Sequence, residues 1–403
     1  MRGLLKFLAA LVVVVALAWF GLWWYAQGRM QAGFTNWVNQ QNSTNPEIKI
    51  SFERMTPGSS PLAARLSLVN LRIQAQPDAN LPPVTFVLPS FALRIDATNP
   101  TLMHFDFPDQ VNIDASDGNT TVKFGSIAVS EQINPAALFS ATAQPFNGMD
   151  ATADDIDLLA GGGSLLILHA DHFMAHAVMN ENAGAGQSAL RVNEGFDGIA
   201  ISPLLTKIAS IPFDGKINQW TNKLTLSGPV PANWQAAMKQ LGSLPAADQA
   251  ARQKLVLREM QDWAAHGGHG AFGMQLAIGP STLKASGTVT FGARTQPAGT
   301  AALTADHLNA FATAVVNAYP QTQNQVNQIE ATLSPYISAN NQSGQTLNLQ
   351  VAYGAHGVII NGQKIADMPP VNWTKLENTP LPVAPPPATS QAPGDGSGAA
   401  MGD

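Results

Sequence analysis

Cysteine is absent from the chain of 403 residues, which excludes disulfides, thiolate zinc sites, iron–sulfur clusters and cysteine nucleophiles. Charged residues are scarce as well. Asp, Glu, Lys and Arg make up 12% of the chain, compared with about 25% in an average soluble domain. The formal net charge is −6, and the sequence has no cluster of Lys and Arg of the kind that binds nucleic acid. We therefore expect no nucleic-acid partner.

A long uncharged run lies near the N-terminus, from Phe7 to Tyr25, and reads FLAALVVVVALAWFGLWWY. As a helix it would span about 28 Å, close to the roughly 30 Å of a bilayer's hydrocarbon core. Arg2 and Lys6 precede the run, and Trp and Tyr gather at its far end, as is typical of a membrane interface. The run predicts an uncleaved membrane anchor. The alternative is a signal peptide that is cleaved near residues 26–28, AQG.

The part of the chain after the anchor is dominated by patterns of antiparallel strands. Apolar and polar residues alternate in 91–97, 283–294 and 347–353, and an Asn-Gly pair at 361–362 is typical of a tight hairpin turn. We therefore expect an α+β fold that is predominantly antiparallel β, in which helices pack on a long twisted sheet.

Helical stripes interrupt these strands in three places. Two helices that break near Leu244 are expected within 231–266, a third over 308–319, and a fourth over 326–337. Their apolar residues recur at the spacing of one helix face, which favours packing against the sheet over a free surface.

The densest group of titratable side chains is LLILHADHFMAH, residues 165–176. On a helix, His169, His172 and His176 could share a metal ion. On a strand, His169 and Asp171 would point one way and the other two histidines the opposite way, with His172 and His176 about 13 Å apart. Three glycines and a strand-like LLIL lead into the histidines, which favours the strand. We therefore assign no catalytic, cofactor-binding or metal-ligating residue, and keep a metal site at these four side chains as the alternative.

Other catalytic motifs are missing from the sequence. It contains no G-x-S-x-G elbow, no phosphate-binding loop that ends in Gly-Lys-Ser/Thr, and no H-E-x-x-H. Asp154, Asp155 and Asp157 lie together but lack the later ligands of a calcium loop. The sequence therefore offers no cofactor site.

Four segments resemble single-span alphaproteobacterial envelope proteins that are grouped as domain of unknown function 2125. They are GLWWYAQGRMQAGFTNWV, ISFERMTPGSSPLAARLSLVNLRI, LKASGTVTFGARTQPAGTAALTADHLNAF and LNLQVAYGAHGVIINGQKIADMPPV. The family has Gly-Phe-Pro where this chain has Ser59-Ser60-Pro61. That family has no known active site, so the resemblance implies no catalytic residue. The chain is also similar to AsmA-like envelope proteins, which implies a long curved antiparallel sheet and a role around lipid or outer-membrane assembly.

Anchor, composition and resemblance together predict a single-pass protein of the bacterial inner membrane, with residues 1–6 in the cytoplasm, 7–25 in the membrane and 26–378 as a periplasmic β-rich domain of one or two halves. Residues 379–403, rich in Pro, Gly and Ala, are expected to be disordered. The expected function is a non-enzymatic envelope scaffold or a carrier of apolar or lipid ligands, with a possible envelope-protein partner. The alternative function is a metal-dependent periplasmic hydrolase that uses the four side chains between 169 and 176.

Overall fold

The protein is described by a computed structural model that covers residues 2–44, 47–76, 82–116, 118–133, 146–231, 248–290, 298–340 and 344–368, with positions 234, 237, 240, 241 and 244. The predicted tail, 379–403, lies outside these residues.

A single helix, α1 (Arg2–Thr44), leads into the sheet. The side chains of this helix are described only from residue 21 onward, apart from residue 22, so most of the predicted anchor lies outside the described side chains. Among the described residues, no helix is both long and apolar enough to cross a membrane. The membrane anchor stays a prediction.

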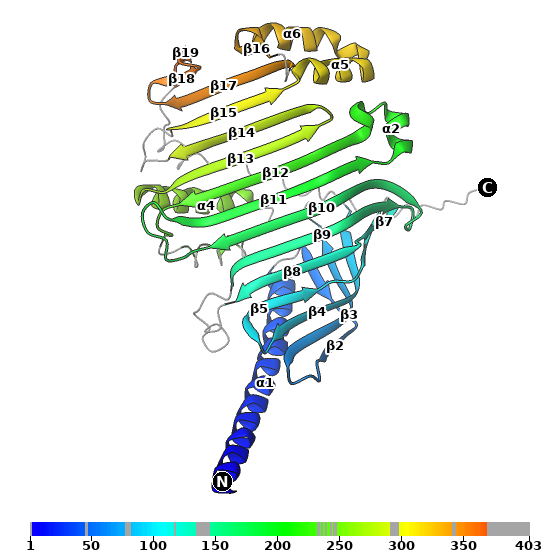
Figure 1. The fold of residues 1–403 in the computed structure, drawn as a ribbon, viewed down its shortest axis with the longest axis vertical. Helices are drawn as coiled ribbons and strands as arrows, with labels where there is room; N and C mark the ends of the chain where they lie inside the picture. The colour runs from blue at the N-terminus through cyan, green and yellow to red at the C-terminus, as the bar shows by residue number, and fades with distance from the viewer. Residues whose placement is uncertain are drawn as a thin grey trace, which may run out of the picture.

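The strands form one antiparallel sheet in which most neighbours in sequence are also neighbours in space (Figure 1). Its first part comprises β1 (Ile48–Ser51), β2 (Arg54–Pro57), β3 (Ala63–Ala75), β4 (Val84–Asp96), β5 (Asn99–Asp106), β6 (Gln110–Ala115), β7 (Gly118–Lys123) and β8 (Ser126–Ile133). Both β1 and β2 pair with β3, which pairs with β4. Two short strand pairs, β5 with β8 and β6 with β7, then join β4 to β9.

The second part is a row of strands that begins with the longest ones. It comprises β9 (Phe146–Ala160), β10 (Leu165–Met179), β11 (Ser188–Ile201), β12 (Lys216–Ser227), β13 (His269–Ile278), β14 (Ser281–Thr290), β15 (Ala298–Asp306), β16 (Ile337–Asn340), β17 (Gly344–Gly354), β18 (Gly357–Ile360) and β19 (Gln363–Ala366). From β9 to β15 the order in the sheet follows the chain, and β15 then pairs with β17. The sheet ends in the short strands β16, β18 and β19, and short edge strands limit pairing with other chains.

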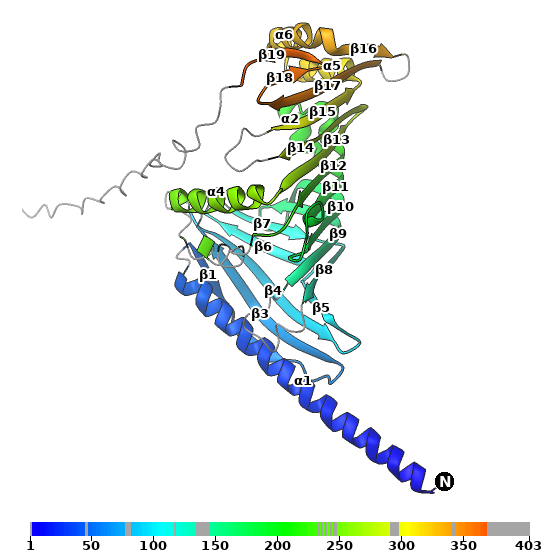
Figure 2. The same cartoon turned by 90° about the vertical axis from the view of Figure 1, so that its left-hand side faces the viewer.

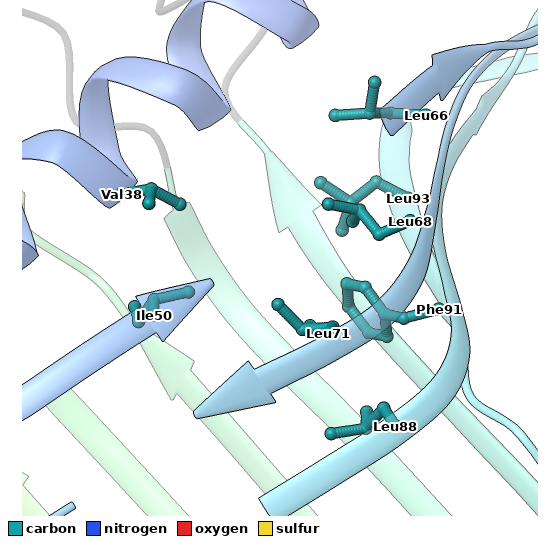
Figure 3. Packing of buried hydrophobic residues seen from close by; sticks show 8 residues of the cluster. All are labelled: Val38, Ile50, Leu66, Leu68, Leu71, Leu88, Phe91 and Leu93. Atoms are coloured by element: carbon teal, nitrogen blue, oxygen red, sulfur yellow. The ribbon is translucent and has the colours of Figure 1, made fainter. Parts of the chain in front are cut away.

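The best-buried core lies where α1 packs on β1, β3 and β4 (Figure 3). Leu66 and Leu68 of β3 are 0% and 1% exposed, and Val38 of α1 joins them. The remaining members of this cluster are Ile50, Leu71, Leu88, Phe91 and Leu93. Alternation places Leu66 with Leu68 on β3 and Phe91 with Leu93 on β4. The pairing skips Asn70, whose φ is 51°, and this interruption brings Leu71 and Leu88 to the same side, on which α1 lies.

Side-chain amides of α1 complete the hydrogen bonding of backbone groups at this edge. The amide of Gln27 both accepts from the Arg65 backbone N–H, at 2.9 Å, and donates to the Arg65 carbonyl. Asn42 does the same for Ile50, at 2.7 and 2.8 Å. Because unpaired backbone groups at a sheet edge are costly when buried, these amides fix the position of α1 along the edge.

Four further helices are placed on the remaining sheet: α2 (Pro203–Ala209), α4 (Gln249–Ala265), α5 (Leu308–Ala318) and α6 (Gln323–Leu333). Helix α4 begins at Asp248, whose carboxylate accepts from the Ala251 N–H at 3.0 Å. Figure 2 shows α4 on the same side of the sheet as α1, whereas α2, α5 and α6 lie at the end of the sheet that is far from α1.

Most of the predicted elements are confirmed. Strands β4, β14 and β17 contain residues 91–96, 283–290 and 347–353 of the alternating segments, and α5 matches the helix expected over 308–319. Residues 291–294 of the second segment lie outside the described residues. The fourth helix was predicted too long, because α6 ends at Leu333 and Ile337 begins β16. Pro335, which lies between them, cannot continue an α-helix. Of the pair expected within 231–266, α4 is the second, and the first falls largely outside the described residues.

The core described above predicts a large difference between two leucines of one segment. Leu66→Ala should lower the free energy of unfolding by about 2–5 kcal/mol, because it leaves a cavity in packed surroundings. Leu62→Ala, at a position that is 71% exposed, should change it by less than about 0.5 kcal/mol. Urea denaturation of both variants tests this, and equal effects would contradict the assignment of the core to this end of the sheet.

Candidate functional site

The segment 165–176 is part of a strand, as predicted. Strand β10 lies between β9 and β11, with pairing to β9 over residues 165–178 and to β11 over residues 168–179. All four side chains of the alternative metal site, His169, Asp171, His172 and His176, therefore lie on one extended strand, and the helical arrangement that would have gathered the three histidines does not form.

Each histidine of β10 is paired with an aspartate directly opposite it on β9. His169 Nδ1 lies 2.8 Å from Asp157 Oδ1, and His172 Nδ1 lies 2.6 Å from Asp154 Oδ1. The third pair, His176 and Asp150, is also in direct contact. Side-chain pairs that interact across neighbouring strands each stabilise a sheet by roughly 0.2–1 kcal/mol, so these contacts support the β9–β10 pairing. They do not draw the histidines together.

His169 differs from the other two because both of its ring nitrogens face carboxylates. Its Nε2 lies 3.1 Å from Asp171 Oδ1, two residues along the same strand. The hydrogen bond to Asp157, followed by that to Asp171, raises the pKa of His169 above its usual value. A ring held in this way is favoured as the imidazolium, which donates from both nitrogens. It is therefore unsuited to bind a metal ion.

No group of three or more His, Asp or Glu side chains in the described part of the chain is placed to hold a metal ion. Strand geometry accounts for this at β10, because His172 and His176 are four residues apart and each is turned to its own aspartate. The separation of about 13 Å that the sequence predicts for His172 and His176 follows from the rise per residue of an extended strand.

The aspartate partners are the residues that sequence reasoning missed, although a signal for them exists. Asp150, Asp154 and Asp157 are spaced by four and then three residues, and the histidines by three and then four. Mirrored spacing of two opposite residue types around the turn at Gly161–Gly163 is what an antiparallel pair produces. From the sequence alone, Asp154 and Asp157 are considered only as calcium ligands, and Asp150 is not considered.

One face of the sheet carries few charged side chains. We define the apolar face as one side of the sheet between β8 and β18. It consists of Met149, Ala151, Ala153 and Met179 and of the side chains that lie in the same rows on successive strands. From β8 to β18 its other members are Ile127, Val129, Glu131, Phe173, Ala175, Ala177, Leu190, Val192, Glu194, Phe196, Trp220, Asn222, Leu224, Leu226, Gly270, Phe272, Met274, Leu276, Leu283, Ala285, Gly287, Val289, Gly299, Ala301, Leu303, Ala305, Leu347, Leu349, Val351, Tyr353, Val358 and Ile360.

The apolar face continues into the core beside α1. Val129 is opposite Phe105 of β5, Phe105 is opposite Leu93 of β4, and Leu93 is opposite the buried Leu66. At that end the face is covered, whereas farther along the sheet large side chains stay open to solvent. Met149, Leu224 and Phe272 are each about two-fifths exposed. A soluble face would bury or replace such residues, and their alignment in one row forms an apolar surface of the kind that binds other molecules.

Helix α4, the apolar face and described residues between Val230 and Leu241 line a partly open cavity of about 550 Å³, within the range of roughly 300–1,000 Å³ that is usual for small-molecule sites. The helix contributes Leu255, Val256, Glu259, Met260 and Trp263, and the sheet contributes residues of β10 to β14 that include Leu224 and Phe272. Phe272 fits here because Gly287 lies opposite it, where a Cβ would come within 2.6 Å of its ring. Every described lining residue except Glu259 is apolar.

The apolar face itself carries the carboxylate of Glu131, on β8. Its opposite neighbours are Met103 on β5 and Met149 on β9. Burial raises the pKa of Glu131 to about 7, because a charged carboxylate is poorly solvated among apolar side chains. At neutral pH this position is therefore only partly charged, which keeps the face close to apolar.

Comparison with known proteins supports the resemblance to domain of unknown function 2125. The family model described as "Uncharacterized protein conserved in bacteria (DUF2125)" matches residues 23–365. The chain belongs to this family. The matched residues begin in the part of α1 that packs on β3 and continue through the sheet as far as β19. No curated protein matches the chain.

The contacts of His169 predict a pH dependence in this member of the DUF2125 family. Because its folded pKa is raised, the stabilisation from its carboxylates is complete below the unfolded pKa of roughly 6.5, and it is lost as the pH rises through the folded value. Asp157→Asn should lower the pKa of His169 in an NMR titration and destabilise the protein more at pH 5 than at pH 9, two conditions set about 1.5 to 2.5 units either side of that reference. Asp155→Asn, on the same strand but outside these contacts, should leave the pKa unchanged. An unshifted His169 in Asp157→Asn would contradict the pairing.

Glu131 predicts the opposite dependence. Its folded pKa is above the unfolded one, so the folded state binds the extra proton, and stability falls as the pH rises from roughly 4.5 to about 7. Glu131→Gln should raise the free energy of unfolding by about 1–2 kcal/mol above pH 8, roughly one unit past the folded pKa, after allowance for partial exposure. The gain should vanish near pH 4, below the unfolded pKa. Urea denaturation at both pH values measures it, with Glu330→Gln on exposed α6 as the control. A gain that persists at low pH would show that burial does not set this pKa.

Proposed function

We propose that this protein is a non-enzymatic carrier of apolar or lipid ligands, held at the bacterial inner membrane by its N-terminal segment, with the sheet in the periplasm. The observation that carries the proposal is the row of half-exposed apolar side chains that leads into the cavity beneath α4. A purely structural scaffold has no need to leave Leu224 and Phe272 open to water.

The energetic basis is the removal of apolar surface from water. Burial stabilises a complex by roughly 25 cal/mol for each Å² of apolar area. An alkyl chain that lies along the apolar face would cover both its own surface and that of Met149, Leu224 and Phe272. Because the strands run side by side without a change of face, the chain would meet side chains of the same kind from β8 to β18.

The hydrolase alternative has no comparable support. Its four residues lie on one strand, and the three histidines each face a separate aspartate of β9. Strand geometry at residues 165–176 favours the carrier over a metal-dependent enzyme.

The proposal predicts where an apolar photoprobe reacts with the full chain. A long-chain alcohol that bears a diazirine should label peptides of α4 and β13, and unlabelled alcohol should compete until labelling is lost. Phe272→Gln should reduce labelling by about fivefold, as expected for the loss of roughly 40 Å² of apolar contact. Mass spectrometry of the digested protein locates the label.

Met174→Gln is the matched control. Met174 and Phe272 are equally exposed, at 39%, but Met174 alternates with Phe173 and so lies on the other face of the sheet. Its variant should label as the parent does. Labelling that cannot be competed, or that falls equally in both variants, would leave the scaffold as the remaining function.

A further inference from the structure

One carboxylate lies in the otherwise apolar lining of the cavity beneath α4. Glu259 is 7% exposed, and on α4 it lies between Leu255 and Trp263, which also line the cavity. Burial of a carboxylate is costly unless it is paired. A buried carboxylate such as that of Glu259 lowers the stability of the folded protein, and such carboxylates are typical of functional positions.

Among the described residues the carboxylate is hydrogen-bonded by Arg258, whose side chain lies at the surface. Arg258 donates to Glu259 Oε1 from Nε at 3.2 Å and from Nη2 at 3.0 Å. The Arg258 side chain is 65% exposed, and ion pairs of exposed side chains contribute only about 0–1 kcal/mol. Both bonds go to the same oxygen, Oε1, and Glu259 itself lines the cavity, so a donor within the cavity competes with the exposed arginine for this carboxylate.

The apolar face offers acidic groups and no basic ones. Its charged members are Glu131 and Glu194, and none of its described residues is Lys or Arg. Glu194 is engaged by Asn222, whose Nδ2 donates to it at 3.1 Å. The electrostatic potential along this face therefore favours a cationic ligand group over an anionic one.

We propose that the cavity binds a long-chain amphiphile whose ammonium group is attached directly to the apolar chain, with the ammonium donating to Glu259 and the chain lying on the apolar face. The inference rests on the proposed carrier function and adds the chemical class of the ligand. A charge-assisted hydrogen bond in an apolar site is roughly twice as strong as a neutral one, so the ammonium distinguishes this ligand from an alcohol with the same chain.

Competition against the diazirine-bearing alcohol tests the inference on the full chain. Dodecylammonium, dodecanol and dodecanoate share a chain and differ only in the head group. Dodecylammonium should halve the labelling of α4 peptides at about one-tenth of the concentration that dodecanol requires, and dodecanoate should be the weakest. Equal competition by all three, or the strongest competition by dodecanoate, would overturn the inference.

Two variants assign the preference to the carboxylate. Glu259→Gln should still be labelled but should lose the advantage of dodecylammonium over dodecanol, whereas Glu330→Gln on α6 should keep it. Arg258→Gln removes the competing cation and leaves the carboxylate in place, so it should increase the advantage even if Glu259→Gln fails to fold. An unchanged preference in Arg258→Gln and in Glu259→Gln would overturn the role of Glu259.

The two proposals fail in different ways. If the neutral probe shows no labelling that can be competed, the carrier function itself is wrong. If the probe labels the cavity but the ammonium has no advantage, the carrier stands and only the ligand class is wrong.

Discussion

The fold depends on a strand register that is continuous from β8 to β18 over the residues of the apolar face. The shifts in register lie at or beyond the edges of that face, between Gln132 and Ile133, between Leu166 and Leu168, and between Ser188 and Leu190. A shift of one residue in any of these pairings would turn a whole strand's apolar side chains to the other side. The register instead places Met149, Ala177, Val192, Leu224 and Phe272 in one row across five strands. In a single-layer sheet, such a row is either covered by another element or open to solvent. In this protein, α1 covers the apolar side chains at one end of the sheet, and farther along the sheet they are partly open.

Helix α1 buries the apolar side chains of the core beside it, whereas α4 covers the apolar face only in part. At the first site the helix seals Leu66 and Leu68 and pairs with edge backbone through Gln27 and Asn42. At the second, α4 stands off far enough to leave a cavity of about 550 Å³. The covered end supplies the stability, and the open end supplies a binding surface. Structure and proposed function therefore come from the same uneven covering of one apolar face.

Local patterns predicted much of this fold, and non-local pairings account for what was missed. Alternation identified β4, β14 and β17, and the LLIL run before His169 identified β10 as a strand, because these signals lie within one element. The aspartates opposite the histidines belong to another strand, so their role required the register of β9 against β10. The cavity lining at Glu259 was equally out of reach, because it depends on how α4 sits on strands far away in the sequence.

A ligand on the apolar face can be detected by organic-solvent extraction of the full chain purified from cells, followed by mass spectrometry of the extract. We expect a long-chain amphiphile at near one molecule for each protein chain, at a level well above that in an equally purified Phe272→Gln variant. A folded parent protein that yields no such compound, and whose extract matches that of the variant, would rule out the carrier function.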